Sequence, residues 1–368
     1  MDKKRKIIQF FEQYDDLYQP YLPPIMEALS IEEGFDVSIY ATKGKSRSKV
    51  KVLPGYYLKG FYKYFYLKGF KYSLNYEILY FLKQNPDIIH LQHSFLFNKF
   101  LKLFQLPKRE RPKLVITLRG ADTYLRPWRK EKWKHFYKDY GNKVDAFITV
   151  SEHQKKYLTK WGVQRDRVHV IPISFGDASK ALPKVSIGDT INLVSAHRMT
   201  WEKNIEGNLR TVKVLKEKGV NLMYHIYGDG PDTAQIFYLI DKYGINDIVT
   251  YHGKVKNSQF KAELKSYDIF LQLSHSESFG LTVVEAQAMG LPAIISNSDG
   301  IPETIIDGKT GYCFNPWDVE LAANTIIRLK NDTALFNSMS RAAISNANKK
   351  FTYEVEVEKL IKLYNSLL

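Results

Sequence analysis

Cysteine is almost absent from this chain, and long apolar runs are missing altogether. Cys313 is the single cysteine among 368 residues, so no disulfide can form within the chain. Its place in the strand-like segment 312–314 favours a buried, inert thiol. No apolar run is long enough to cross a bilayer, and Glu12 ends the first one too early for a signal peptide. These absences predict a cytosolic protein, either soluble or peripheral to a membrane.

The sequence also lacks a recognisable metal site, a solenoid repeat and a low-complexity tail. A zinc site needs three or four ligands, and no cysteine or carboxylate accompanies His90 and His93 at a suitable spacing. We therefore expect no metal. His90 is expected to be buried and hydrogen-bonded. His93 follows a predicted strand, where side chains face a cleft, so a role at that cleft and a purely structural role both stay open.

Strand and helix signals alternate along the chain, which predicts a doubly wound α/β fold. A polar stretch punctuated by Pro172, Gly176, Pro183 and Gly188 separates two such halves. The length of 368 residues fits two Rossmann-like domains facing a cleft. We expect domains at residues 1–175 and 176–350, with a final helix at residues 351–368. The clearest predicted strands span residues 6–11, 36–41, 87–91, 113–118, 146–150 and 191–196.

Two carboxylates, Glu277 and Glu285, flank a segment that predicts the start of a short helix. Good helix formers follow Leu281, while Gly290 and Pro292 supply a stop signal. Glu285 is thus expected in the first turn, where it can accept hydrogen bonds from a ribose diol. In the alternative interpretation, Glu285 merely complements the helix dipole and Glu277 is a solvated loop residue.

The backbone at this predicted helix start is suited to an anion. The N–H groups of Phe279, Gly280 and Leu281 would point outward without partners, and Gly280 permits close approach. Upstream, Arg198 and Lys203 follow a predicted strand, at the edge where open α/β sheets bind ligands. Two cations there would meet a diphosphate, although a pair of surface cations in a basic protein is the plainer interpretation of either one alone.

These elements, in this order, resemble the family-four retaining glycosyltransferases of GT-B fold, which transfer a sugar from a nucleotide-sugar donor. The resemblance covers most of the C-terminal half. Its further marks are the segments 227–231, 252–255, 297–303 and 307–312.

The resemblance implies roles for individual residues and for both domains. Arg198 and Lys203 would stabilise the donor diphosphate, and Glu277 would lie near the transferred sugar. Residues 1–175 would bind the acceptor, residues 176–350 the donor, and the terminal helix would cross back to the first domain. The implied reaction is a same-face displacement with no cofactor and no obligatory metal. The remaining implied donor-binding residues are Gly228, Gly253, Lys254, Val255, Ser278, Phe279, Gly280, Leu281 and Glu285.

Two departures from the family pattern concern the acceptor side. Arg119 stands where many members carry a histidine, and arginine only donates hydrogen bonds. Arg119 would either contact an acidic group on a sugar or pair with Asp122, and we prefer the ion pair. His93 is a candidate substitute for the histidine. The usual N-terminal glycine-rich loop is also missing at residues 14–20. The candidate catalytic residues are Glu277, Arg198, Lys203, His93 and Arg119.

Other activities on the same fold stay open from the sequence alone. A phosphorylase or a nucleotide-sugar epimerase would use similar phosphate sites. A protein that only binds nucleotide sugars or nucleic acid is less favoured, because the set of Arg198, Lys203, Glu277 and Glu285 is intact.

The net charge of +15 indicates an anionic partner. Aromatic residues and lysines alternate from Tyr56 to Tyr72, a pattern typical of membrane interfaces. We therefore predict docking on the anionic inner face of the cell membrane and a lipid-linked or surface-glycan acceptor. Core packing with lysines reaching to solvent, and less so single-stranded nucleic acid, are the alternatives for this segment.

Replacing Lys59, Lys63, Lys68 and Lys71 by glutamate tests this interpretation. Each lysine near an anionic leaflet contributes about 1 kcal/mol of attraction. The quadruple variant should therefore lose sedimentation with anionic vesicles, whereas neutral vesicles should bind neither protein. Unchanged binding by the variant would contradict membrane docking through this segment.

Overall fold

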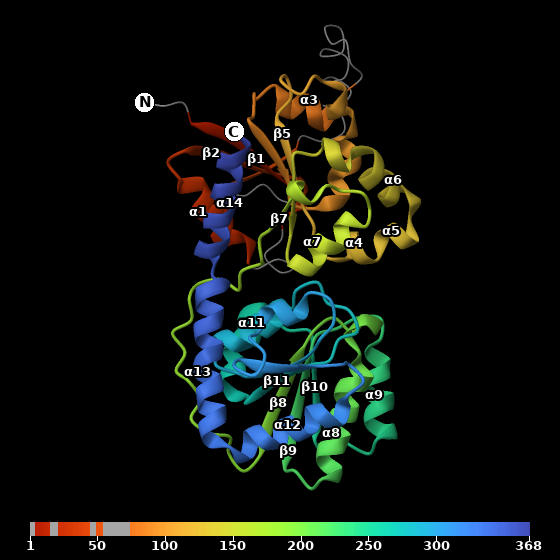
Figure 1. The fold of residues 1–368 in the computed structure, drawn as a ribbon, viewed down its shortest axis with the longest axis vertical. Coiled ribbons are helices and arrows are strands. Elements are labelled where there is room, and N and C mark those ends of the chain that lie inside the picture. Colours follow the sequence, from red (N-terminus) through yellow and green to blue (C-terminus); the bar gives the residue numbers. More distant parts are fainter. Residues whose placement is uncertain (1–3, 15–20, 45–48, 54–73) are drawn as a thin grey trace. The chain divides into compact units, whose positions relative to one another are not determined.

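The computed structural model describes residues 4–14, 21–44, 49–53 and 74–368. The chain divides into unit 1, Met1–Pro172 with Glu356–Leu368, and unit 2, Ile173–Val355. Each unit is a parallel sheet with helices packed against it (Figure 1). The predicted pair of doubly wound halves is therefore confirmed. The segment from Tyr56 to Tyr72 and residues 15–20 lie outside the described residues, and within the described part no helix is long and apolar enough to cross a membrane.

Unit 1 contains a seven-stranded sheet in the order β3-β2-β1-β4-β5-β6-β7. Its inner strands are mostly apolar because both faces are buried, and β4 is buried at every residue. The strands are β1 Arg5–Gln13, β2 Phe35–Lys43, β3 Val50–Val52, β4 Ile88–Leu91, β5 Lys113–Thr117, β6 Ala146–Thr149 and β7 Val168–Val170.

The last helix of the chain, α14, belongs to unit 1 from Glu356 onward. Its Tyr364 is fully buried, and the Tyr364 hydroxyl accepts a hydrogen bond from Gln9 Nε2 at 2.8 Å. This contact joins α14 to β1. The helices in the described part of unit 1 are α1 Leu22–Ile31, α3 Tyr76–Leu82, α4 Ala121–Tyr124, α5 Arg126–Arg129, α6 Glu131–Tyr140, α7 Glu152–Thr159 and α14 Tyr353–Leu367.

Unit 2 contains a six-stranded sheet in the order β10-β9-β8-β11-β12-β13. Its strands are β8 Ile191–Ala196, β9 Leu222–Tyr227, β10 Val249–Gly253, β11 Ile269–Gln272, β12 Ala293–Ser296 and β13 Gly311–Phe314, and its helices are α8 Ile205–Glu217, α9 Thr233–Lys242, α10 Asn257–Glu263, α11 Leu281–Ala288, α12 Val319–Asn331 and α13 Thr333–Lys350.

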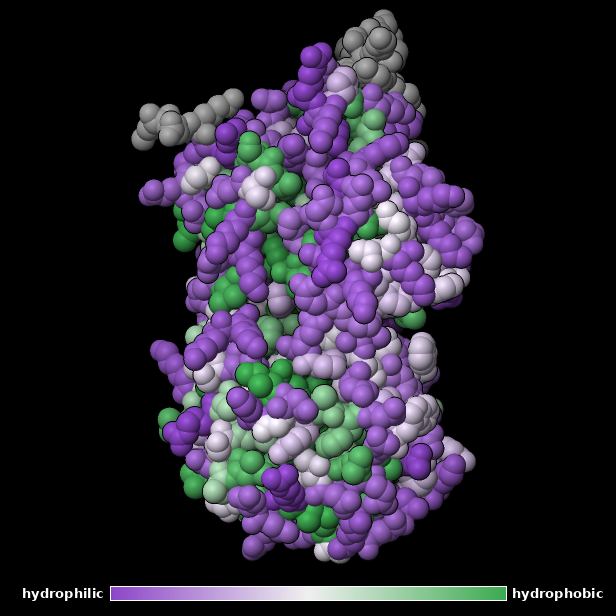
Figure 2. Space-filling view, viewed as in Figure 1, coloured by the Kyte–Doolittle hydropathy of each residue, from purple (hydrophilic) through white to green (hydrophobic). Residues whose placement is uncertain are grey.

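Helices cover both faces of this second sheet. Apolar residues of α8, α9 and α12 form one core cluster, and residues of α10 and α11 contribute to the other. Hydrophilic side chains cover most of the face drawn in Figure 2, with smaller hydrophobic groups between them. Cys313 lies in β13 as predicted but is only partly buried, and burial raises the pKa of its thiol.

Each sheet has a topological switch point. The strands that follow the first strand are added on one side of it, and later strands are then added on its other side. In unit 2 the first strand, β8, lies between β9 and β11, and in unit 1 β1 lies between β2 and β4. Ligands of open α/β sheets bind at the carboxyl ends of the strands beside such a point. In unit 2 this position selects the loops that follow β8 and β11.

Candidate functional site

The loop after β11 leads into α11, which begins at Leu281 as predicted. Gly280 precedes the helix with a φ of 95°, a conformation that favours glycine, and an added Cβ would lie 3.0 Å from Ile301 Cγ1. Within the described residues, the backbone N–H groups of Phe279, Gly280 and Leu281 donate to no other group. They are backbone donors without an internal partner, as expected at the start of a helix.

The helix also ends where the sequence indicates. Gly290 has a φ of 80° and donates its N–H to Gln287 O at 2.9 Å. The N–H of Leu291 donates to Ala286 O at 3.1 Å. These two bonds form a Schellman motif, which satisfies the last carbonyls and fixes the length of α11.

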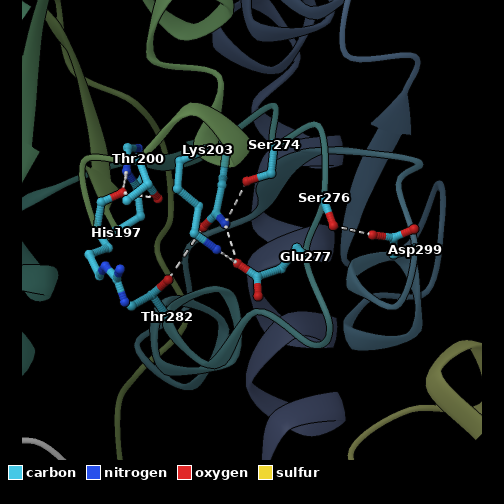
Figure 3. A network of polar contacts seen from close by, with 10 residues as sticks. His197, Thr200, Lys203, Ser274, Ser276, Glu277, Thr282 and Asp299 are labelled. Atoms are coloured by element: carbon cyan, nitrogen blue, oxygen red, sulfur yellow. Dashed lines mark hydrogen bonds and ion pairs between the residues drawn. The ribbon is translucent and has the colours of Figure 1, made fainter. Parts of the chain in front are cut away.

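A chain of polar contacts connects the loop after β8 with the first turn of α11 (Figure 3). The Lys203 ammonium forms a short ion pair with Glu277 Oε2. The Lys203 side chain is 14% exposed and the Glu277 side chain 15%. Gln272, the last residue of β11, donates to the same Glu277 oxygen at 3.2 Å. Its own Oε1 accepts from Thr282 Oγ1 at 3.4 Å. The ammonium of Lys203 is therefore held at the switch point of the sheet.

Glu285 is buried in α11 and only 2% exposed. It is the fifth residue of the helix, so its predicted place in the first turn was wrong by one position. Its Oε1 accepts from Asn257 Nδ2 at 2.9 Å and lies 3.5 Å from Lys261 Nζ. Its Oε2 is buried without a hydrogen-bond partner among the described residues. Burial raises the pKa of this carboxyl, although Lys261 and Asn257 act in the opposite direction.

Arg198 lies in the same loop as Lys203, but its side chain is used differently. The side chain is exposed, and its guanidinium makes no hydrogen bond or ion pair within the described part of the chain. Its carbonyl accepts from the N–H of Thr200 at 2.9 Å and contacts the Nδ1 of His197 at 3.3 Å. The structure thus joins Lys203 to Glu277 and leaves Arg198 available to a ligand.

His197 is a residue of this loop that the sequence did not single out. Burial, with the nearby Lys203, lowers the pKa of its imidazole to about 4, so the ring is neutral at pH 7. Its Nε2 is buried and has no partner among the described residues. Gln272, Asn257 and Lys261 were also not predicted, since nothing in their spacing indicates which carboxylate each one meets.

Close backbone contacts join the loops after β8, β9 and β10. Gly228 has a φ of 121°, and an added Cβ would lie 1.9 Å from His197 O, so only glycine fits there. Its N–H donates to Gly253 O at 2.8 Å. Val255 is partly buried and packs against the hydrophobic cluster to which α11 contributes. Lys254 is exposed. Ser278 lies half-buried in the loop that precedes α11.

His90, in β4, and His93, just after it, lie in different surroundings. His90 is fully buried, with Tyr364 and Thr117 hydroxyls each 2.7 Å from a ring nitrogen, so its predicted state is confirmed. His93 is half-buried at the switch point and accepts the N–H of Glu12 at Nδ1, 3.0 Å away. Burial and then Arg119 lower the pKa of His93 to about 4. Its neutral ring therefore carries its hydrogen on Nε2.

Arg119 does not form the ion pair with Asp122 that we preferred. Its guanidinium donates to Gln92 Oε1 at 3.0 Å and lies 5.2 Å from the Tyr21 ring centre. The Asp122 carboxylate instead accepts from Ser94 Oγ at 2.6 Å and from the backbone N–H of Arg119 at 3.2 Å. The Asp122 carboxylate therefore already accepts hydrogen bonds from Ser94 and from the backbone at the start of α4, and it does not pair with the Arg119 guanidinium.

Metal-binding groups are scarce in the same region. Within the described residues, no three histidine, cysteine, aspartate or glutamate side chains are grouped so that they could hold a metal ion. Among the described residues, the loops of the candidate site carry the ammonium of Lys203, the exposed guanidinium of Arg198 and the backbone donors before α11.

Two family models match the chain, one in each half. Residues 28–173 match Glycosyltransferase Family 4, and residues 180–350 match Glycosyl transferases group 1. The chain belongs to this glycosyltransferase family. It is a retaining enzyme that transfers a sugar from a nucleotide sugar, as the resemblance implied, and its two sheets form the GT-B fold.

Similarity to individual relatives and solved structures extends over almost the whole chain. A 41.2 kDa protein from the cps region of Klebsiella pneumoniae is 26% identical over 300 residues, which are 77% of this chain and 80% of that one. The putative colanic acid biosynthesis glycosyltransferase WcaL of Escherichia coli is 24% identical over 269 residues, 70% of this chain and 65% of WcaL. Anabaena HepE with UDP has a TM-score of 0.77 at 15% identity, covering 98% of this chain and 100% of that one.

Proposed function

We propose that unit 2 binds the diphosphate of the donor between the loop after β8 and the start of α11. The observation that carries this proposal is the chain of contacts from Lys203 through Glu277 and Gln272 to Thr282. It holds a cation beside a helix start whose backbone N–H groups have no internal partner. A diphosphate between them would meet positive charge on both sides. Arg198, whose side chain is exposed in the same loop, would add a second cation.

The nucleoside would lie along α11 and the loop after β10. Glu285 supports this placement because its Oε2 is an unused acceptor in a buried position, which a ribose hydroxyl would satisfy. Gly253, Lys254 and Val255 follow β10 directly and would line the base. Gly228 would keep the loops after β8 and β10 close enough for one nucleotide to contact both.

The proposed chemistry places charge stabilisation where the leaving group develops it. When the bond from the sugar to the diphosphate breaks, the diphosphate gains negative charge, and Lys203 with the N–H groups of residues 279–281 would stabilise it. Glu277 would have two tasks, since its carboxylate fixes the Lys203 ammonium and would also lie near the transferred sugar. Fixed donors need no reorganisation during the reaction, which is the source of their catalytic effect.

The acceptor is proposed to be a lipid-linked or surface glycan. The aromatic and basic segment from Tyr56 to Tyr72 supports an acceptor at a membrane surface. The names of the Klebsiella and Escherichia relatives, with their cps region and colanic acid biosynthesis, agree with polysaccharide assembly. In unit 1, the neutral His93 would present its Nε2–H to an acceptor hydroxyl, and Arg119 would contribute a fixed charge nearby.

A thermal-shift screen against UDP, GDP, ADP and their common sugar conjugates tests the donor site. A ligand that binds only the folded protein raises its melting temperature, by about 2.7 kcal/mol of added stability at a concentration of 100 times Kd. We expect UDP to stabilise the protein most, because the Anabaena neighbour was crystallised with UDP and with UDP-glucose. Stabilisation by none of the three diphosphates would contradict the proposed placement.

A further inference from the structure

Unit 2 contains a cavity of about 670 Å³ that the donor site does not use. We call it the tryptophan pocket, and its lining includes Trp201, Arg210, Gln235, His275 and Trp317. Its walls come from the loops after β8, β9, β11 and β13 and from the N-terminal halves of α8 and α9. These helices pack on the face of the sheet that carries α12, whereas α11 with Glu285 packs in the other cluster.

The tryptophan pocket nevertheless begins close to the ion pair of the donor site. Trp201 precedes Lys203 by two residues, and His275 precedes Glu277 by two. The N–H of His275 donates to Glu202 O at 2.8 Å, so the two loops are bonded to each other between the pocket and the ion pair. A molecule held in the pocket would thus lie beside the loops that carry Lys203 and Glu277.

Two indole rings dominate the pocket and are unusually exposed for their size. Trp201 is 61% and Trp317 65% exposed, although tryptophan is usually well buried. The ring of Trp317 is held by His275, with ring centres 4.6 Å apart and planes at 37°. Flat apolar surfaces of this kind cover the C–H faces of sugar rings while the ring hydroxyls keep polar partners. A volume of about 670 Å³ lies within the usual range of ligand pockets.

Polar side chains around the rings are available for those hydroxyls. Arg210, Asp232 and Gln235 make no side-chain hydrogen bond or ion pair within the described part of the chain. Together they offer donors and acceptors, which matches hydroxyl groups that act in either sense. Glu206 lines the same wall and accepts from the Tyr243 hydroxyl at 2.6 Å.

The charge of the tryptophan pocket separates it from the rest of this basic protein. Asp232 and Glu206 supply two carboxylates against the one guanidinium of Arg210. Burial lowers the pKa of His275, so this imidazole adds no positive charge at neutral pH. A polyanion such as a nucleic acid or a phosphate-rich glycan would find no attraction here. The chemistry therefore favours an uncharged ligand with many hydroxyl groups.

We infer that the tryptophan pocket binds pyranose rings of an uncharged glycan chain. The inference goes beyond the proposed function, because binding here requires neither the donor nor sugar transfer. A glycan held at this place extends past the sugar unit that reacts, so an enzyme with this subsite favours long acceptors over single sugars.

Saturation-transfer NMR on the full chain without nucleotide tests the inference, with cellohexaose, maltohexaose and chitohexaose as neutral probes and a heparin hexasaccharide as the polyanion. We expect saturable binding of at least one neutral probe with a millimolar Kd, which corresponds to about 4 kcal/mol. Trp201→Ala and Trp317→Ala should each weaken it about tenfold. Trp128→Ala is the matched control, because that indole is 58% exposed and lies in unit 1.

The contrary results are equally definite. The inference is overturned if no neutral hexasaccharide binds, if only the heparin probe binds, or if both substitutions leave the affinity unchanged. Should Trp317→Ala fail to fold after losing its contact with His275, Trp201→Ala decides, because Trp201 has no ring contact among the described residues. Stabilisation by a nucleoside diphosphate should persist in both variants, which separates a failure here from a failure of the proposed donor site.

Discussion

Lys203→Ala is expected to lower kcat about 100-fold or more while weakening donor binding only a few-fold. The ammonium is already held by Glu277 in the free protein, so it is placed to act when the leaving diphosphate gains charge. Loss of one such preorganised group typically costs about 3 kcal/mol in the transition state. Steady-state rates with the donor found in the thermal-shift screen, together with its Kd from calorimetry, measure the two effects separately.

Lys218→Ala is the control for this experiment. Lys218 also forms an ion pair, with Glu320 at 3.4 Å, but both side chains are well exposed and the pair lies outside the candidate site. Exposed pairs of this kind contribute little, so its kcat should stay near that of the wild type. If Lys203→Ala lost donor affinity and kcat by the same factor, the contact would be made equally in the ground state, and the proposed role would be wrong.

Most of the fold follows from the sequence because buried parallel strands leave a strong pattern. The prediction of residues 191–196 matches β8 to the residue, and α11 begins and ends at the predicted signals. The end of α11 at Gly290 could be predicted from the sequence, because a Schellman motif needs a residue with positive φ and glycine adopts it readily. The position of Lys203 after a strand likewise indicated the sheet edge where it lies.

Partner choice within the site was much harder to predict. A side chain at the end of a strand can meet any neighbour across the sheet edge, and sequence spacing carries no information about which one. Arg119 illustrates this, because Asp122 is three residues away and yet its carboxylate is satisfied by Ser94 and by backbone N–H groups. The unpartnered Glu285 Oε2 and His197 Nε2 are also invisible in a sequence, since they result from the packing of other elements.

Glu285→Ala is expected to abolish the thermal stabilisation by the donor nucleotide. A hydrogen bond to a charged group contributes about 1.5–3 kcal/mol, so loss of the ribose contacts should weaken binding roughly 100-fold. Comparison of UDP with 2′-deoxy-UDP and 3′-deoxy-UDP assigns the effect to the ribose. The wild type should distinguish UDP from at least one deoxy form, and Glu285→Ala should bind all three equally. A variant that still discriminated between them would place the ribose elsewhere.

Glu285→Gln should separate binding from stability, because the shape of the side chain is kept and the charge removed. Burial raises the pKa of this carboxyl above 4.5 in the folded protein, so the ionised form lowers the free energy of unfolding at neutral pH. The nucleotide-free variant should therefore melt higher than the wild type, by on the order of 2 °C at pH 7.

The pH dependence of this difference identifies its cause. Below about pH 4.5 the carboxyl is protonated in both the folded and the unfolded wild type, so the advantage of Glu285→Gln should vanish there. It should grow as the pH rises through the interval between the two pKa values. Glu217→Gln, which alters an exposed pair with Lys213, should show no such trend. A variant less stable than the wild type at pH 7 would mean that the Lys261 contact outweighs the cost of burial. The expected gain would instead show that the enzyme keeps a destabilising carboxylate because the donor requires it.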